Sequence, residues 1–68
     1  MIENILSGRE VIFEFFPVGR TYVKVSAMDV LTFTEISIQC PANAAQNLMK
    51  RNALKRLEYV LKKQGLIK

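Results

Sequence analysis

Histidine and tryptophan are absent from this 68-residue chain, which has one cysteine, three glycines and two prolines. With no histidine and only Cys40, the usual ligands of a metal site are missing, and no disulfide can form within the chain. Neither paired carboxylates in an evident pocket nor a glycine-rich phosphate loop offers other chemistry. We therefore expect no enzyme activity, no catalytic residue, no metal site, no cofactor and no small-molecule ligand.

Long apolar runs are also lacking. No stretch approaches the ~20 apolar residues that a membrane-spanning helix needs, and residues 1–7 lack the basic start and long apolar core of a signal peptide. An unpaired cysteine suits the reducing cytosol. We expect a single domain over residues 1–68 that is cytoplasmic and has no membrane partner.

Three strands are predicted by alternating apolar and polar residues, at about residues 10–17, 21–28 and 34–40. Turn residues at 17–20 and a loop at 29–34 separate them, so the strands are expected to form an antiparallel meander. Cys40 falls in phase with the apolar positions of the third strand and is expected to be buried. The face predicted to be buried comprises Val11, Phe13, Phe15, Val23, Val25, Ile36 and Ile38.

A long amphipathic helix is predicted over about residues 44–64. Asn43 is the expected N-cap, with Gln46 returning a hydrogen bond to it, and Gly65 is the expected left-handed residue after the last turn. Glu58 is placed to pair with Lys62, four residues later. At 100° per residue the apolar arc comprises Met49, Ala53, Leu54, Leu57, Val60 and Leu61.

The fold class that follows is α+β. Three antiparallel strands in a meander pack against one long C-terminal amphipathic helix, in the order βββα. In one interpretation, a short helical turn at residues 1–6 precedes the first strand. Leu48 and Tyr59 do not fit the helix's apolar arc, because they fall near its basic side.

Positive charge is concentrated in the helix. The net charge of +4 divides into −2 over residues 1–41 and +6 over residues 42–68. Such a basic stretch suits an anionic partner such as the phosphates of nucleic acid, although it also keeps a helix face solvated. The candidate nucleic-acid-binding residues are Lys50, Arg51, Lys55, Arg56, Lys62 and Lys63.

Self-association is the other prediction. Half of the residues are hydrophobic, and a three-stranded sheet with one helix leaves a face and two edges uncovered. We expect a non-enzymatic interaction protein that acts as a homodimer, with nucleic-acid binding as the alternative function. Either a swap, hinged at residues 29–34 or at Pro41, or a side-by-side arrangement is compatible with the sequence. The candidate interface residues are Ile12, Phe16, Tyr22, Met28, Leu48 and Tyr59.

Five segments carry a family resemblance: REVIFEF at 9–15, VKVSAMD at 23–29, TE at 34–35, PANAA at 41–45 and ALKRLEYVL at 53–61. Together they resemble a family of small uncharacterised alphaproteobacterial proteins. The resemblance implies a bacterial, compact, dimer-forming βββα domain without an assigned activity. Phe33 departs from it, because family members tend to have glycine after the threonine of this loop. If the position needs a positive φ, we expect Phe33 to be strained there.

Overall fold

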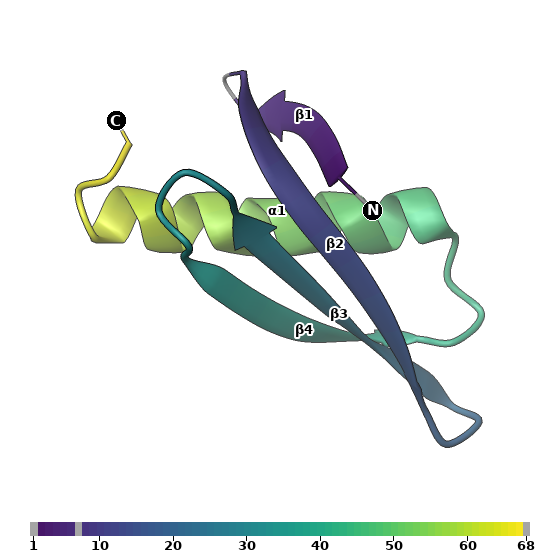
Figure 1. Cartoon of the computed structure of the whole chain (residues 1–68). Coiled ribbons are helices and arrows are strands. Elements are labelled where there is room, and N and C mark those ends of the chain that lie inside the picture. Colours follow the sequence, from purple (N-terminus) through teal and green to yellow (C-terminus); the bar gives the residue numbers. More distant parts are fainter. Residues whose placement is uncertain (1, 7, 68) are drawn as a thin grey trace.

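The computed structural model describes residues 2–6 and 8–67 as an antiparallel sheet with one helix lying across one face (Figure 1). The described residues form β1 (Ile2–Leu6), β2 (Arg9–Val18), β3 (Tyr22–Asp29), β4 (Glu35–Pro41) and α1 (Gln46–Lys63). The strands lie in the order β1-β2-β3-β4, so each pairs with its neighbour in sequence. The α+β class and the predicted three antiparallel strands before a C-terminal helix are confirmed by β2, β3, β4 and α1.

The hairpin of β2 and β3 is the longest paired unit of the sheet. Its register runs from Val11 opposite Asp29 to Val18 opposite Tyr22, and its tip projects beyond the helix (Figure 1). Since side chains alternate along a strand, Val11 and the core residues face α1, while the intervening residues face outward. The sheet therefore has one face covered by α1 and an outer face on the opposite side.

The core lies between α1 and the inner face of the sheet, where the helix packs mainly on β3 and β4. A fully buried large apolar side chain contributes roughly 1.5–3 kcal/mol. Four of the predicted face residues, Phe15, Val23, Ile36 and Ile38, are half-buried at the edges of this core. The buried members are Val11, Phe13, Val25, Ala27, Cys40, Met49, Ala53, Leu57 and Leu61.

The expected N-terminal helical turn is wrong. Residues 2–6 form β1, which pairs antiparallel with β2 in a register that sets Ile2 opposite Ile12, with an irregularity between Asn4 and Leu6. Met1, the first residue of the expected turn, lies outside the described residues. Backbone hydrogen bonding to β2 determines the structure of this segment, which lacks a clear alternating pattern of its own.

The predicted N-cap is also wrong. The helix begins at Gln46 with Ala45 as N-cap, and no side chain caps it. Asn43 instead lies in a turn closed by a hydrogen bond of 3.0 Å from the Ala44 amide to the Pro41 carbonyl. This turn carries the chain from the sheet to the helix and delays the helix start beyond residue 44.

The C-terminal end of α1 is the one predicted from the sequence. Gly65 has a φ of 74°, and its amide donates to the Lys62 carbonyl at 3.0 Å while the Leu66 amide donates to the Leu61 carbonyl at 2.9 Å. These two bonds form a Schellman motif, in which a left-handed residue ends the helix. The predicted pair of Glu58 and Lys62 is present, with a separation of 3.6 Å between Oε1 and Nζ.

Phe33 has a φ of 59°, which is the left-handed conformation in which the sequence analysis expects it to be strained. It lies in the loop joining β3 to β4, one residue before the last, and its amide donates to the Asp29 carbonyl at 2.8 Å. Its side chain is 75% exposed, so little packing offsets the cost of this backbone conformation. For a non-glycine residue that cost is about 1–2 kcal/mol.

Replacing Phe33 by glycine should therefore stabilise the domain by about 0.5–1 kcal/mol, since relief of strain exceeds the added flexibility of the unfolded chain. The measurement is the free energy of unfolding from urea titrations of both proteins. A loss of stability in Phe33→Gly would contradict the strain and would mean that the phenyl ring contributes packing.

Candidate functional site

A buried ion pair joins the start of β2 to the end of β3. The Arg9 guanidinium donates from Nε to Oδ1 of Asp29 at 3.1 Å and from its terminal nitrogen to Oδ2 at 2.7 Å. The Asp29 side chain is fully buried, and that of Arg9 is 15% exposed. Two parallel hydrogen bonds of this kind fix both position and angle.

The same carboxylate organises the loop between β3 and β4. Thr32 donates to Oδ2 of Asp29 from its amide at 3.1 Å and from its hydroxyl at 2.7 Å. The Thr32 hydroxyl also lies 2.8 Å from that of Thr34. Asp29 thus links Arg9, at the start of β2, to the loop that follows β3.

The hydrogen bonds from Arg9, and then those from Thr32, lower the pKa of Asp29 to about 2, although burial of the carboxyl opposes the shift. The pKa of Arg9 is raised in turn, chiefly by its hydrogen bond to Asp29. Both groups therefore stay charged at neutral pH, and Asp29 has no proton to exchange there. The pair is suited to holding structure rather than to acid–base chemistry.

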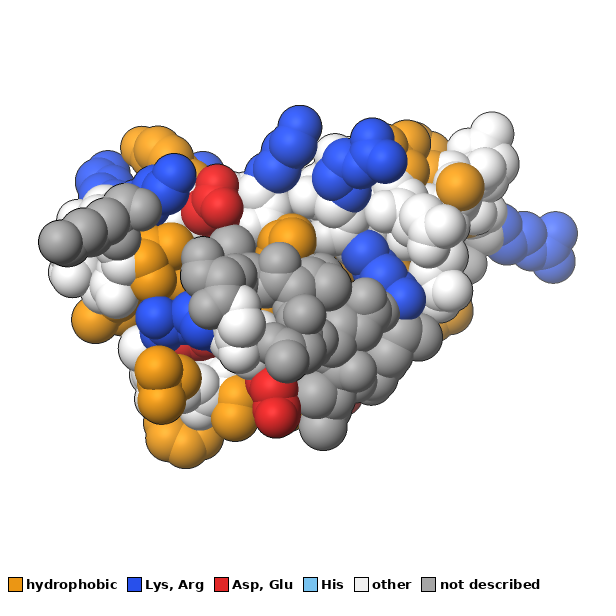
Figure 2. All heavy atoms as spheres, turned by 90° about the horizontal axis from the view of Figure 1, so that it is seen from above, with side chains coloured by type: hydrophobic (Ala, Val, Ile, Leu, Met, Phe, Trp, Pro, Cys, Tyr) orange, Lys and Arg blue, Asp and Glu red, His pale blue; other side chains and the backbone are white. Residues whose placement is uncertain are grey.

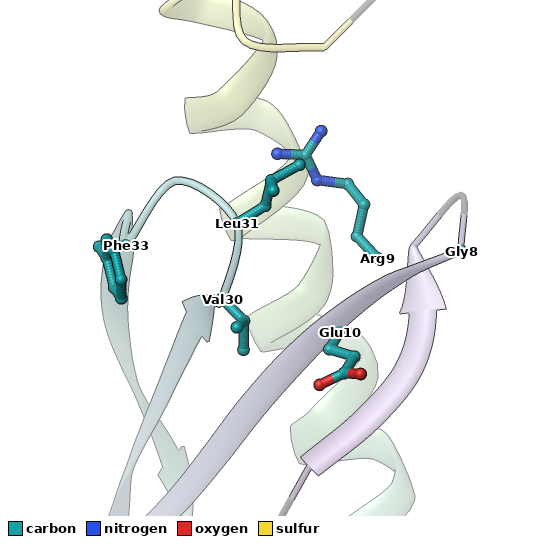
Figure 3. Close-up of a pocket in the computed structure, with 6 residues that line it drawn as sticks. All are labelled: Gly8, Arg9, Glu10, Val30, Leu31 and Phe33. Carbon is teal, nitrogen blue, oxygen red and sulfur yellow. The ribbon is translucent and has the colours of Figure 1, made fainter.

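A hollow of about 400 Å³ opens beside this ion pair (Figure 3). Its walls come from two segments that the ion pair holds together, residues 8–10 at the start of β2 and three residues of the loop. Leu31 and Phe33 are 73% and 75% exposed, so the loop side is apolar and open to water. The lining residues are Gly8, Arg9, Glu10, Val30, Leu31 and Phe33.

Charge in the hollow comes from β2. Among the described residues that line it, the ionisable side chains are Arg9, which is bound to Asp29, and Glu10. Cys40 is distant in the fold, in the core between α1 and the sheet, and is buried as predicted. Within residues 2–6 and 8–67, no group of three or more histidine, cysteine, aspartate or glutamate residues is arranged to hold a metal.

Five of the six predicted basic residues are exposed along α1, and the sixth, Lys50, is half-buried. Figure 2 shows lysine and arginine side chains spread along the side of the molecule that α1 forms, with one acidic side chain beside them. In α1 the only acidic residue is Glu58, which is paired with Lys62. The outward side of α1 is therefore a strongly positive surface, which we call the basic helix face: Arg51, Lys55, Arg56, Tyr59, Lys62 and Lys63.

Tyr59 belongs to this face. The Arg56 guanidinium carbon lies over its ring at 5.4 Å from the centroid, and the Lys63 ammonium nitrogen at 5.9 Å. Such cation–π contacts hold long cationic side chains near an aromatic ring. They account for an apolar residue on the solvent side of α1, where Tyr59 is 54% exposed.

The candidate interface residues separate into two groups. Ile12 and Met28 are opposite each other on the outer sheet face and are half-buried, while Phe16 and Tyr22 on the same face are 45% and 43% exposed. Val18, which is opposite Tyr22, adds a further exposed apolar side chain. Leu48 and Tyr59 lie on the outward side of α1, across the sheet from this group. These two residues cannot share one flat interface with the other four.

Sequence reasoning missed the ion pair. It placed Asp29 at the start of a loop, whereas Asp29 is the last residue of β3 and points toward the core side. The register of the β2–β3 hairpin could have revealed the pair. A hairpin that sets Val11 opposite Asp29 makes Arg9 a diagonal neighbour of that aspartate.

The pH dependence of stability tests the ion pair. The pKa of Asp29 is lowered in the folded state to about 2, so its contribution is complete above about pH 4 and is lost as the pH falls through about 2. Asp29→Asn should lower the free energy of unfolding by about 3 kcal/mol at pH 7. The difference between the two proteins should shrink toward zero near pH 2.

Urea unfolding of both proteins from pH 2 to pH 7 measures this difference. Glu10→Gln, which removes an exposed carboxylate from the same strand as Arg9, is the matched control and should stay within about 0.5 kcal/mol of the parent. A difference between parent and Asp29→Asn that does not change with pH would contradict the assignment.

No helix within the described residues is both long and apolar enough to cross a membrane. No curated protein and no solved structure matches the chain. One protein-family model does match, over residues 8–64, a span that runs from the glycine before β2 to the C-cap of α1 and includes the ion pair. The chain belongs to the family described as a domain of unknown function, DUF6898.

Proposed function

We propose that this chain is a non-enzymatic interaction domain that acts as a homodimer joined through the outer face of its sheet. One observation carries the proposal: Phe16, Val18 and Tyr22 are 41–45% exposed on the same face of the β2–β3 hairpin. Large apolar side chains gathered on one uncovered face are typical of a surface that another protein covers.

Charge on that face suits a second copy of the chain. Glu14 is opposite Ser26 and Phe16 is opposite Lys24, so Glu14 and Lys24 are diagonal neighbours on adjacent strands. A two-fold axis between them would set Glu14 of each copy near Lys24 of the other. Lys24 already lies over the Phe16 ring, 5.8 Å from its centroid, which keeps the cation beside the apolar cluster.

Chain size supports association as well. A domain of about 60 residues buries only about 60% of the surface that its unfolded chain exposes, so contact with a partner adds appreciably to its stability. We favour the side-by-side arrangement over a swap, because Asp29 holds the 29–34 loop, one of the two candidate hinges, by hydrogen bonds.

We also infer a bacterial, cytoplasmic protein. The family resemblance supports the bacterial origin, and a lone buried cysteine suits a reducing compartment. Nothing in the proposed dimer needs a cofactor or a membrane.

Sedimentation equilibrium over a range of protein concentrations tests the dimer. The parent protein should fit a mass twice that of the 7.8-kDa chain, and Phe16→Glu should shift it to the monomer while circular dichroism remains unchanged. A glutamate at this half-exposed position meets water in the monomer but is buried without a partner in the dimer.

Leu48→Glu is the matched control, because Leu48 is 44% exposed and Phe16 is 45% exposed. It lies on α1, on the other side of the sheet, and should leave the dimer intact. A parent protein that stays monomeric at high concentration would refute the proposal. Dissociation by Leu48→Glu but not by Phe16→Glu would move the interface to the helix.

A further inference from the structure

None of the residues in the described core, or packed against it, belongs to the basic helix face. The core-facing side of α1 is formed by Met49, Ala53, Leu57 and Leu61, which are buried. All six residues of the basic helix face are exposed. Their charges therefore contribute little to holding α1 on the sheet, and this surface remains available for a partner.

The charge of α1 is large for its length. Its 18 residues carry six cationic side chains and one glutamate, a net charge of +5. Glu58 lies 3.6 Å from Lys62 and pairs with it. Between Arg51 and Lys63 the cations of the basic helix face extend along about 18 Å of helix axis, at 1.5 Å per residue.

We propose that the basic helix face binds the phosphate backbone of nucleic acid without reading its sequence. Duplex nucleic acid carries one negative charge per about 1.7 Å of its axis, so a cationic surface about 18 Å long meets many phosphates at once. A single small anion would engage only one or two of these side chains. The distribution of charge therefore favours a polymer of phosphates over an isolated phosphate ligand.

An anionic membrane is the competing polyanion, and the packing of α1 argues against it. A helix that lies in a membrane surface inserts its apolar side into the lipid. In this chain that side is covered by the sheet, and the outward side offers only Leu48 and Tyr59 as exposed large apolar residues.

Tyr59 gives the face a defined arrangement. Arg56 and Lys63 both lie over its ring, so two cations about two turns apart are held against the same side chain. Positioning long side chains before binding reduces the entropy lost when they contact phosphates. Tyr59 is thus a positioning residue for the two cations beside it.

Nucleic-acid binding by the basic helix face does not depend on the proposed dimer. One chain carries the whole basic helix face, and the outer sheet face lies on the opposite side of the sheet. A side-by-side dimer through the sheets would place its two basic helix faces on opposite outer surfaces, each able to bind. A monomer in sedimentation would therefore leave this proposal standing.

Fluorescence anisotropy with a labelled 20-base-pair DNA duplex, the same sequence as duplex RNA, and single-stranded oligo-dT tests the binding from 25 to 200 mM KCl. Binding should weaken linearly in log–log form, with a slope of about −0.9 per phosphate contact on duplex DNA. Lys55→Gln should flatten that slope by about one unit and weaken binding about tenfold at 50 mM salt, the loss that one contact's slope implies.

Arg20→Gln is the matched control, because it removes one exposed positive charge from the tip of the β2–β3 hairpin instead. It should change the affinity by less than about twofold. The double variant Lys55→Gln, Lys62→Gln should lose about two units of slope. Circular dichroism of each variant verifies that α1 is intact.

Variants of Tyr59 test whether its ring positions Arg56 and Lys63 for binding. Tyr59→Leu should weaken binding about two- to fivefold, the value of one exposed cation–π contact, whereas Tyr59→Phe keeps the ring and should bind like the parent. Three outcomes would overturn the proposal: no binding to any nucleic acid at 25 mM salt, equal losses in Lys55→Gln and Arg20→Gln, or binding to phosphatidylglycerol vesicles without binding to nucleic acid.

Discussion

The packing of α1 against the inner face of the sheet is the interaction on which the rest of this molecule depends. It buries the apolar side of the helix and the core side of three strands, from Phe13 to Leu57 and Leu61. One helix covers only one face of a sheet. The same packing therefore leaves two surfaces open, the outer sheet face with its apolar hairpin and the basic helix face.

The ion pair of Arg9 and Asp29 strengthens this arrangement at one end of the sheet. It removes two charges from water almost completely, a cost that only good geometry and additional hydrogen bonds offset. Asp29 meets that condition, since Arg9 and Thr32 together donate four hydrogen bonds to it. The loop that carries Phe33 in a left-handed conformation is thereby held in place, which allows a strained residue to persist there.

Local pattern made much of this fold predictable. Alternation located β2, β3 and β4, and the helical period located α1 with Gly65 at its end. The features that were not predicted depend on contacts between different segments of the chain. β1 forms by pairing with β2, and the Arg9–Asp29 ion pair follows from the register of the β2–β3 hairpin. The helix begins at Gln46 and not at the predicted residue 44, because Asn43 lies in the turn that follows Pro41. The basic residues of α1 were foreseen, but the contacts of Tyr59 with two of them required side-chain positions.

We infer that α1 divides the surface into two faces with separate uses. An amide chemical-shift map of isotopically labelled protein, recorded on dilution and again on addition of duplex nucleic acid, distinguishes the two faces. Dilution should shift amides of β2 and β3, around Phe16 and Tyr22, and duplex should shift amides of residues 50–63 in a salt-dependent way. Changes that fall on the same residues in both series, or no change in either, would contradict this division of the surface.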